Sequence, residues 1–462
     1  MHNFFLHKNI LIFRRFFNSA NRFIETIEMK KIRLLQISDI HWQKQLDAED
    51  DYTDVRDQML QDLKYYCEAT KNNFDKILIC GDIAFSGAEE EYIRANEFIN
   101  ELCTIVGCKK TEVYTVPGNH DKNVNVSPKK VREFFHQAMC DLSGKHNWWW
   151  QEMYKEDFPF VKKLYAPFEN YNKFCNDERD NVEPFMLNAL EPNVNSYNEA
   201  PMYWHSEFED DFEGYHIHLY GVNSALTSDL SDYDDSEERK GGHYLFLPKV
   251  SYRGAKNLDG NINILMCHHP LDFLLNKDEI QKDLDSRYVL QLFGHVHIAD
   301  SEMSNGAIHV YSGSLNPGDI NDSTYLPVYN IIELSIAKHE DKDNELIVGL
   351  NVRKYNGDTF EEDKNQSKIF KIPLKIHNVW NLQVKAKEEI LDQKLPDGVT
   401  KRDVRHLFKE NIHGKEIIKE MYPKIECNTS AYMRNQIFLE KVSEDNRWVE
   451  LYNKISNGQN TK

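Results

Sequence analysis

Short apolar runs recur along the chain, and each of them ends in a cluster of small or polar residues. The first six runs are rich in Ile, Val and Leu and cover residues 32–37, 76–80, 112–116, 216–220, 263–267 and 289–293. Continuous apolar runs of this length are typical of strands that are buried on both faces. Helical periodicity at 54–66 and 89–102 separates the first three runs. The opening third therefore predicts a βαβαβ succession with a mostly parallel sheet.

The later apolar runs, at 308–311, 328–334 and 346–353, follow one another without long helical stretches between them. This pattern predicts a second, more antiparallel sheet that packs on the first. Taken together, the runs predict one α/β domain over residues 29–375.

Three segments lack this pattern of strands. Residues 1–28 carry short apolar stretches interrupted by basic residues, which predicts a poorly ordered leader and not a signal peptide, with Met29 a candidate start. Residues 122–214 include an N-cap candidate, Ser127, followed by Pro128 at the first helical position, and predict a largely helical insertion. Helical periodicity in 376–462 predicts a helical C-terminal appendage.

Potential metal ligands follow the carboxyl ends of five of these strands. In an open α/β sheet the carboxyl ends of neighbouring strands border one crevice, so the clusters are expected to converge. Gly81, Gly118 and Gly294 lie where the chain leaves a strand, at positions that favour positive φ or a close backbone approach. The clusters are Asp39-Ile40-His41, Gly81-Asp82, Gly118-Asn119-His120-Asp121, His268-His269 and Gly294-His295-Val296-His297.

The residue types in these clusters indicate metal chemistry. Two ligands separated by one residue, as in Asp39 and His41, lie on the same side of an extended segment. The mixture of imidazole, carboxylate and one amide oxygen suits manganese, iron, zinc or cobalt, and the lack of cysteine in the clusters argues against a structural zinc knot. Any one of these residues alone would more often be a hydrogen-bonded loop residue. A purely structural role is a poor explanation for five ordered clusters, each at a strand end.

The ordered set D-x-H, GD, GNHD, H and GHxH is similar to that of the calcineurin-like metallophosphoesterase family, over roughly residues 30–355. The resemblance implies an α/β fold of two packed mixed β-sheets flanked by helices, a four-layer α/β/β/α sandwich. It also implies two divalent metal ions as cofactors. The family pattern assigns one ion to Asp39, His41 and His297, the other to Asn119, His268 and His295, and a bridging role to Asp82.

The histidine doublet and the position of Phe85 differ from the simple family pattern. Of the histidine doublet, His268 fits the ligand position better, because in similar sequences the ligand stands two places before a proline, here Pro270; His269 is then a second-shell or substrate-side residue. The phosphoprotein phosphatase branch reads GDxxD, whereas Phe85 occupies the second acidic place here. This departure weighs against a protein phosphatase and removes one carboxylate partner for His120, whose general-acid role is implied by the family. Asp121 is a candidate orienting group in its place.

The resemblance implies hydrolysis of phosphate esters by in-line attack of a hydroxide that two metal ions activate, with His120 giving a proton to the leaving group. The run 81–87 looks most like bacterial phosphodiesterases of the cyclic-nucleotide class, so a small phosphodiester such as a cyclic nucleotide is the expected substrate. A nuclease of the same fold and a non-catalytic metal-binding regulatory module are the alternatives.

Two further features have two interpretations each. The aromatic run 148–150 could stack a base, but packing of the insertion onto its domain is the favoured interpretation. Asn223 is expected either near the cleft or in a turn.

Composition narrows the class of substrate. The 462 residues include 75 acidic and 56 basic side chains, for a formal charge of −19, which disfavours a nucleic-acid partner without excluding one. Eight cysteines without CxxC pairing indicate reduced thiols, so we expect a cytoplasmic enzyme. The apolar stretches near the N-terminus are too short for a membrane span, and no membrane partner is expected.

Overall fold

The computed structural model describes most of the chain, with several gaps. Residues 1–28, Ser127, Pro128 and the run 148–150 lie outside the described residues, so the expectations for them stay predictions. The described ranges are 30–43, 53–123, 125–126, 130, 163–177, 203–208, 211–228, 245–255, 260–316, 326–339, 343–374, 395–396, 399–409, 414–422, 435, 438–439, 441–443 and 445–459.

The first sheet has a parallel half and an antiparallel half. The parallel half is formed by β1 (Lys31–Ile37), β2 (Lys76–Ile79) and β3 (Val113–Thr115), in that order. Helices α2 (Thr53–Thr70) and α3 (Glu89–Val106) and the short η1 (Lys110–Glu112) make the connections between them. On the other side of β1 lie the antiparallel strands β10 (Val328–Ala337), β11 (Asn344–Tyr355), β12 (Phe360–Glu362) and β13 (Lys368–Leu374). The predicted βαβαβ opening is present.

The second sheet is mostly parallel, with an antiparallel strand at each edge. Its strands are β4 (Tyr203–Glu207), β5 (His216–Val222), β6 (Asn261–Met266), β7 (Leu290–Phe293), β8 (Ala299–Ser304) and β9 (Ala307–Ser312). Their order is β4-β5-β6-β7-β9-β8, in which β5, β6, β7 and β9 run parallel to one another and the edge strands β4 and β8 run antiparallel to their neighbours.

The later apolar runs do not build a sheet of their own, so that expectation was wrong. The run at 308–311 becomes β9, which turns back from β8 through Asn305 and Gly306, both at positive φ, and pairs parallel to β7. The other two runs become β10 and β11 and extend the first sheet. β10 is buried along nearly its whole length, on both faces of the sheet, whereas β11 alternates between buried and partly exposed residues.

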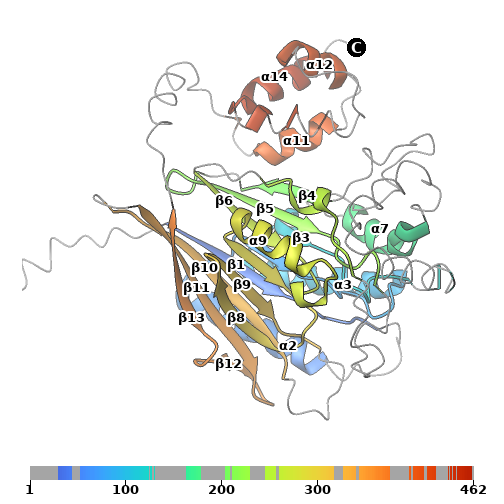
Figure 1. The fold of residues 1–462 in the computed structure, drawn as a ribbon, viewed down its shortest axis with the longest axis vertical. Coiled ribbons are helices and arrows are strands. Elements are labelled where there is room, and N and C mark those ends of the chain that lie inside the picture. Colours follow the sequence, from blue (N-terminus) through green and yellow to red (C-terminus); the bar gives the residue numbers. More distant parts are fainter. Residues whose placement is uncertain are drawn as a thin grey trace, which may run out of the picture.

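The two sheets pack face to face with helices outside them, which confirms the expected sandwich of layers. In β6 and β7, Ile264, Met266 and Leu290 join the core shared with the first sheet. The alternate residues Leu265 and Phe293 point the other way and form a separate core with α9 (Lys277–Arg287). Figure 1 shows α9 lying across the second sheet. Two-residue periodicity therefore separates two cores within one strand.

The described part of the predicted insertion contains helices and one strand. The helices are η2 (Ala166–Phe168) and α7 (Glu169–Asp177), and the strand is β4, which pairs with β5. Three further short helices belong to the second sheet's connections: α8 (Lys249–Tyr252), η5 (Leu271–Phe273) and α9. Among the described residues, no helix combines the length and apolarity that crossing a bilayer requires.

The described part of the C-terminal segment is helical and has a core of its own. It contains α11 (Lys401–Lys409), α12 (Gly414–Met421) and α14 (Trp448–Gln459), which enclose Phe408, Phe438 and Trp448. Figure 1 shows these helices grouped beyond β4. The hydroxyl of Ser443 contacts the buried carboxylate of Glu207 on β4, which connects this group of helices to the second sheet.

Candidate metal centre

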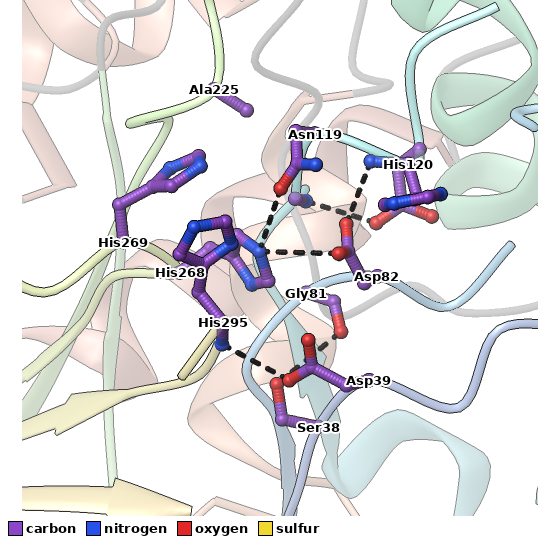
Figure 2. A network of polar contacts seen from close by, with 12 residues as sticks. Ser38, Asp39, Gly81, Asp82, Asn119, His120, Ala225, His268, His269 and His295 are labelled. Atoms are coloured by element: carbon purple, nitrogen blue, oxygen red, sulfur yellow. Dashed lines mark hydrogen bonds and ion pairs between the residues drawn. The ribbon is translucent and has the colours of Figure 1, made fainter. Parts of the chain in front are cut away.

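The loops that follow β1, β2, β6 and β7 are joined by main-chain hydrogen bonds. The amide of Asp39 donates to the carbonyl of Gly81 over 3.1 Å, and the amide of His41 donates to the carbonyl of Asp82 over 3.1 Å. The amide of Gly294 donates to the carbonyl of His268 over 2.9 Å. These bonds bring residues that lie far apart in the sequence to one edge of the two sheets (Figure 2).

Positive φ angles concentrate at the candidate ligands. Non-glycine residues rarely adopt this region, and holding one there costs on the order of 1–3 kcal/mol unless the surroundings enforce it. Such outliers cluster at functional sites, so their position here supports a site and not an ordinary set of turns. The residues are Asp39 (54°), His41 (52°), Asp82 (52°), His295 (69°) and His297 (51°).

Two glycines make this close approach possible. Gly81 has φ of 92°, and a Cβ there would lie 2.4 Å from Nδ1 of His268. A Cβ at Gly118 would lie 2.1 Å from Oδ1 of Asp82. Any side chain at these positions would displace a candidate ligand, which is the physical reason for the glycines in the GD and GNHD motifs.

The first group of ligand atoms comes from Asp39, His41 and His297. Oδ1 of Asp39 lies 3.8 Å from Nε2 of His41 and 3.4 Å from Nε2 of His297. This oxygen is buried, and no described residue donates a hydrogen bond to it. Burial disfavours the charge, but His297 and His268 lower the pKa of Asp39 below its usual range, so the group is a carboxylate at neutral pH. A buried anionic oxygen between two imidazoles fits a bound cation.

The second group surrounds Nε2 of His268. This nitrogen lies 3.2 Å from Oδ1 of Asn119 and 3.3 Å from Oδ2 of Asp82 (Figure 2). On the other side of the ring, Nδ1 lies 2.7 Å from the carbonyl oxygen of Cys80. A carbonyl can only accept, so Nδ1 donates to it and Nε2 faces the two oxygens. His295 also offers a ring nitrogen within 4.8 Å of those of His268 and His269.

Asp82 belongs to both groups. Its Oδ2 lies 3.3 Å from Nε2 of His268 and 4.0 Å from Nε2 of His41, while its Oδ1 accepts the amide hydrogen of His120 at 2.8 Å. The donors around it are imidazole nitrogens, carboxylate oxygens and one amide oxygen, a set that suits divalent manganese, iron, zinc or cobalt. The residues therefore fit metal ions in two adjacent groups that share one carboxylate.

His120 is oriented by the main chain and not by a carboxylate. Its Nδ1 lies 2.7 Å from the carbonyl oxygen of Phe85, to which it can only donate. The ring stands 4.6 Å from the ring of His41, centroid to centroid, and a ring nitrogen lies within 4.8 Å of ligand atoms of His41 and Asp82. The acidic residue missing at position 85 is thus replaced by the backbone of Phe85 itself.

Asp121 was a candidate to orient the ring of His120, but its carboxylate binds backbone amides instead. Its carboxylate accepts hydrogen bonds from the amides of Ile83 (3.1 Å), Ala84 (3.0 Å) and Gly118 (2.9 Å). It is fully buried and lies beneath the loop that carries Asp82. Asp121 therefore fixes the GD loop against the GNHD loop and acts on the candidate ligands through the backbone.

His269 lies beside the second group and is held by a residue that the sequence did not indicate. Its Nδ1 lies 2.8 Å from Oγ of Ser224, and its amide donates to the same oxygen over 3.1 Å. Nε2 of His269 is buried and has no hydrogen-bond partner in the part of the chain that the structure describes. Asn223 makes a turn contact, because its Oδ1 accepts the amide hydrogen of Ala225 at 2.9 Å, and its place near the cleft stays a prediction. The signal for Ser224 was its place just after β5, because β5 pairs with β6 and His268 follows the end of β6.

Lys122 is a second residue that sequence reasoning missed. It follows the GNHD motif directly, and its side chain is buried. Nζ donates to the carbonyl of Leu226 over 3.1 Å and also to the carbonyl of Ser228. The ammonium therefore holds the segment after β5 against the GNHD loop, close to Ser224.

Sequence comparison agrees with this site. Residues 32–299 match the profile of the family described as Calcineurin-like phosphoesterase. The uncharacterized metallophosphoesterase-like protein YydB of Bacillus subtilis is 24% identical over 336 residues, which cover 67% of this chain and 58% of that protein. The 3',5'-cyclic adenosine monophosphate phosphodiesterase CpdA of Haemophilus influenzae is 31% identical over 138 residues, 29% of this chain and 44% of that protein. The chain thus spans less than two thirds of the length of either relative.

Similar solved structures are distant. The purple acid phosphatase PPD1 of yellow lupin is 12% identical, with a TM-score of 0.36 over 75% of this chain and 54% of that one. Vacuolar protein sorting 29 of Cryptosporidium parvum is 10% identical, with a TM-score of 0.31 over 74% of this chain and 98% of that one. The matched profile extends over more than half of the chain and includes every candidate ligand. The chain belongs to the calcineurin-like phosphoesterase family.

Proposed function

We propose that this protein is a metal-dependent phosphodiesterase. Asp39, His41 and His297 would hold one divalent ion and Asn119, His268 and His295 a second, with Asp82 between them. The observation that carries the proposal is the position of Asp82, whose Oδ2 lies within 4.0 Å of the ring nitrogens of His41 and His268. Two ions held in this way would supply a nucleophilic water at neutral pH and would neutralise the charge of the phosphoryl oxygens.

The chain's own residues hold the charge and move the proton. Asp39 and Asp82 are carboxylates at neutral pH, because nearby histidines lower their pKa values against the effect of burial. His120 lies at the border of the site, and its Nδ1 is fixed by the carbonyl of Phe85. This leaves Nε2 to give a proton to the departing ester oxygen.

A small diester is the proposed substrate. Phe85 places no negative charge beside His120, and its backbone already orients the ring. The match to CpdA, whose name describes a cyclic-nucleotide phosphodiesterase, supports a small diester such as a cyclic nucleotide. The formal charge of −19 supports a small substrate over a nucleic acid.

Diesters should be cleaved faster than monoesters. We expect kcat/KM for bis-p-nitrophenyl phosphate to exceed that for p-nitrophenyl phosphate by about tenfold or more, which corresponds to about 1.4 kcal/mol of differential transition-state binding. Both values of kcat/KM are measured with enzyme reconstituted with Mn²⁺. The Asp82→Asn variant is the control, because both activities should be lost in it if both come from this site. A preference for the monoester would contradict the proposed phosphodiesterase and would indicate a phosphatase.

Metal affinity should rise with pH above neutrality. Burial opposes the charged form of His268, but Asp82 and Asp39 raise its pKa to about 9 in the metal-free protein. A metal can bind Nε2 only after the proton has left, so the binding constant should increase by about tenfold per pH unit between roughly pH 7 and 9. Burial lowers the pKa of His41 to about 4 and that of His295 to about 3, so these groups release no proton in this range.

The same shift has a consequence for the stability of the metal-free protein. The pKa of His268 is raised above its usual 6.5, so its contribution to stability is fully present below pH 6.5 and is lost as the pH rises through about 9.

The predicted pH dependence of metal binding can be measured by calorimetric titration with Mn²⁺ at several pH values. The use of two buffers of different ionisation enthalpy gives both the affinity and the proton release. An affinity that stays constant from pH 7 to 9 would contradict the assignment of His268.

A further inference from the structure

We propose that Phe85 determines specificity by binding a planar aromatic ring in the leaving group of the diester. The inference rests on the proposed function, because it names the class of substrate for that site.

Phe85 presents an apolar surface next to the proton donor. Its side chain is 45% exposed, and its ring centroid lies 5.5 Å from that of His120 and 6.2 Å from that of His41. His120 is the residue proposed to protonate the leaving group, so the ring of Phe85 lies on the leaving-group side of the centre. Ile298, which directly follows His297, is also exposed, at 50%, so a second apolar side chain adjoins the candidate ligands in the sequence.

A single exposed phenylalanine on a surface needs no explanation, but the backbone that carries this one is fixed beside His120. The amide of Phe85 donates to the carbonyl of Trp42 over 2.9 Å, and the carbonyl of Phe85 accepts from His120 at 2.7 Å. Both main-chain polar groups of the residue are therefore engaged. The backbone that carries the ring therefore cannot shift without breaking the hydrogen bond that orients His120.

Two buried carboxylates fix the backbone on either side of Phe85. Asp121 accepts the amide hydrogens of Ile83 and Ala84, which precede it. Glu91, at the start of α3, accepts from the amides of Ser86 (2.9 Å) and Ala88 (3.0 Å), which follow it. The loop that carries Asp82 and Phe85 is thus held in place before any ligand arrives, and preorganisation of this kind lowers the entropy lost on binding.

The chemistry of this surface favours a planar ring over a flexible polyol or choline group. An exposed aromatic face stacks on any base or aryl ring, and such stacking contributes a factor of roughly 5 to 150 in affinity per ring. A glycerol or choline leaving group has no such face. Phe85 therefore indicates a nucleoside or aryl diester, in which the ring is carried by the group whose oxygen His120 protonates. In a cyclic nucleotide that P–O bond breaks while the nucleoside stays bonded to phosphorus through its second ester oxygen.

The test compares substrates with and without a ring. We would measure kcat and KM for bis-p-nitrophenyl phosphate, 3',5'-cyclic AMP and glycerophosphocholine with the Mn²⁺ enzyme and its Phe85→Ala and Phe85→Tyr variants. In Phe85→Ala the ratio of kcat/KM on ring-bearing to ring-free diesters should fall by about 10- to 100-fold, mainly through KM. Phe85→Tyr keeps the ring and should restore most of the ratio. Ile369→Ala removes another exposed apolar side chain, 73% exposed on β13, and should leave the ratio unchanged.

Each outcome bears on the inference in a distinct way. An equal loss on all three substrates in Phe85→Ala would mean that the residue only supports His120, and the inference would be overturned. A wild-type enzyme that cleaves glycerophosphocholine but neither ring-bearing diester would also overturn it, while the proposed phosphodiesterase would stand. A wild-type enzyme that binds Mn²⁺ and cleaves no diester would overturn the proposed function and the inference with it.

Discussion

Replacement of Asp82 by asparagine is expected to remove nearly all phosphoesterase activity and much of the bound metal. The asparagine side chain has the same shape, and asparagine tolerates the positive φ of 52° at this position, so the backbone should persist. Its amide oxygen can keep the hydrogen bond from the amide of His120, now made by Oδ1 at 2.8 Å. The amide nitrogen then takes the place of Oδ2 and turns two N–H donors toward His41 and His268, where a cation requires an acceptor.

The experiment measures turnover and metal content on the same preparation. Asp285→Asn is the matched control, because Asp285 is a buried carboxylate that accepts from Nε2 of His309 at 2.8 Å, away from the candidate ligands. Loss of that carboxylate should lower the melting temperature and leave the metal bound. Turnover and metal content close to the wild-type values in Asp82→Asn would disprove the shared position of Asp82.

The sequence predicted the strand ends that carry the site, because two local signals coincide there. Each of the five runs that carry a cluster is followed within two residues by a glycine or a candidate ligand. The structure ends β2 at Ile79 and β7 at Phe293, just before Gly81-Asp82 and Gly294-His295. The convergence of these ends follows from a general property of parallel strands. The structure brings all the candidate ligands together, and their individual roles toward metal remain predictions.

The choice of sheet for the later strands could not be predicted from apolar runs. β9 and β10 have similar patterns of buried residues, yet β9 joins β7 in the second sheet and β10 joins β1 in the first. Strand pairing depends on which open edge is within reach when the chain returns, and periodicity carries no information about that edge. The antiparallel pairing of β1 with β10 could therefore not be predicted from the sequence.

Main-chain contacts were the second kind of information that the sequence lacked. The absence of an acidic residue at position 85 suggested that His120 had lost a partner, but the carbonyl of Phe85 supplies one. Asp121 was recognised as polar and close in sequence to His120, yet its hydrogen bonds go to the amides of Ile83, Ala84 and Gly118. A side-chain pattern indicates which groups are present, while the loop conformation decides whether the backbone can replace them.

His120→Ala should keep both metals and slow turnover by about 10²–10⁴-fold, the usual contribution of a positioned general acid. Metal should be retained because Asp82 contacts the amide and not the ring of His120, so alanine preserves that hydrogen bond. The loss should depend on the leaving group. Nitrophenolate departs with little need for a proton, whereas a nucleoside or alkyl oxygen requires one, so cyclic AMP should lose more than bis-p-nitrophenyl phosphate.

The comparison of kcat for the two esters, in wild type and His120→Ala, separates proton transfer from the other roles open to this ring. One nitrogen of His120 lies within 4.8 Å of ligand atoms of His41 and Asp82, so a role as a metal ligand is the main competitor. Loss of metal in His120→Ala would establish that role. Equal losses on both esters with metal retained would leave His120 as a fixed dipole beside the phosphoryl group. A larger loss on the poor leaving group with metal retained is the expected result, because only a proton donor distinguishes the two oxygens.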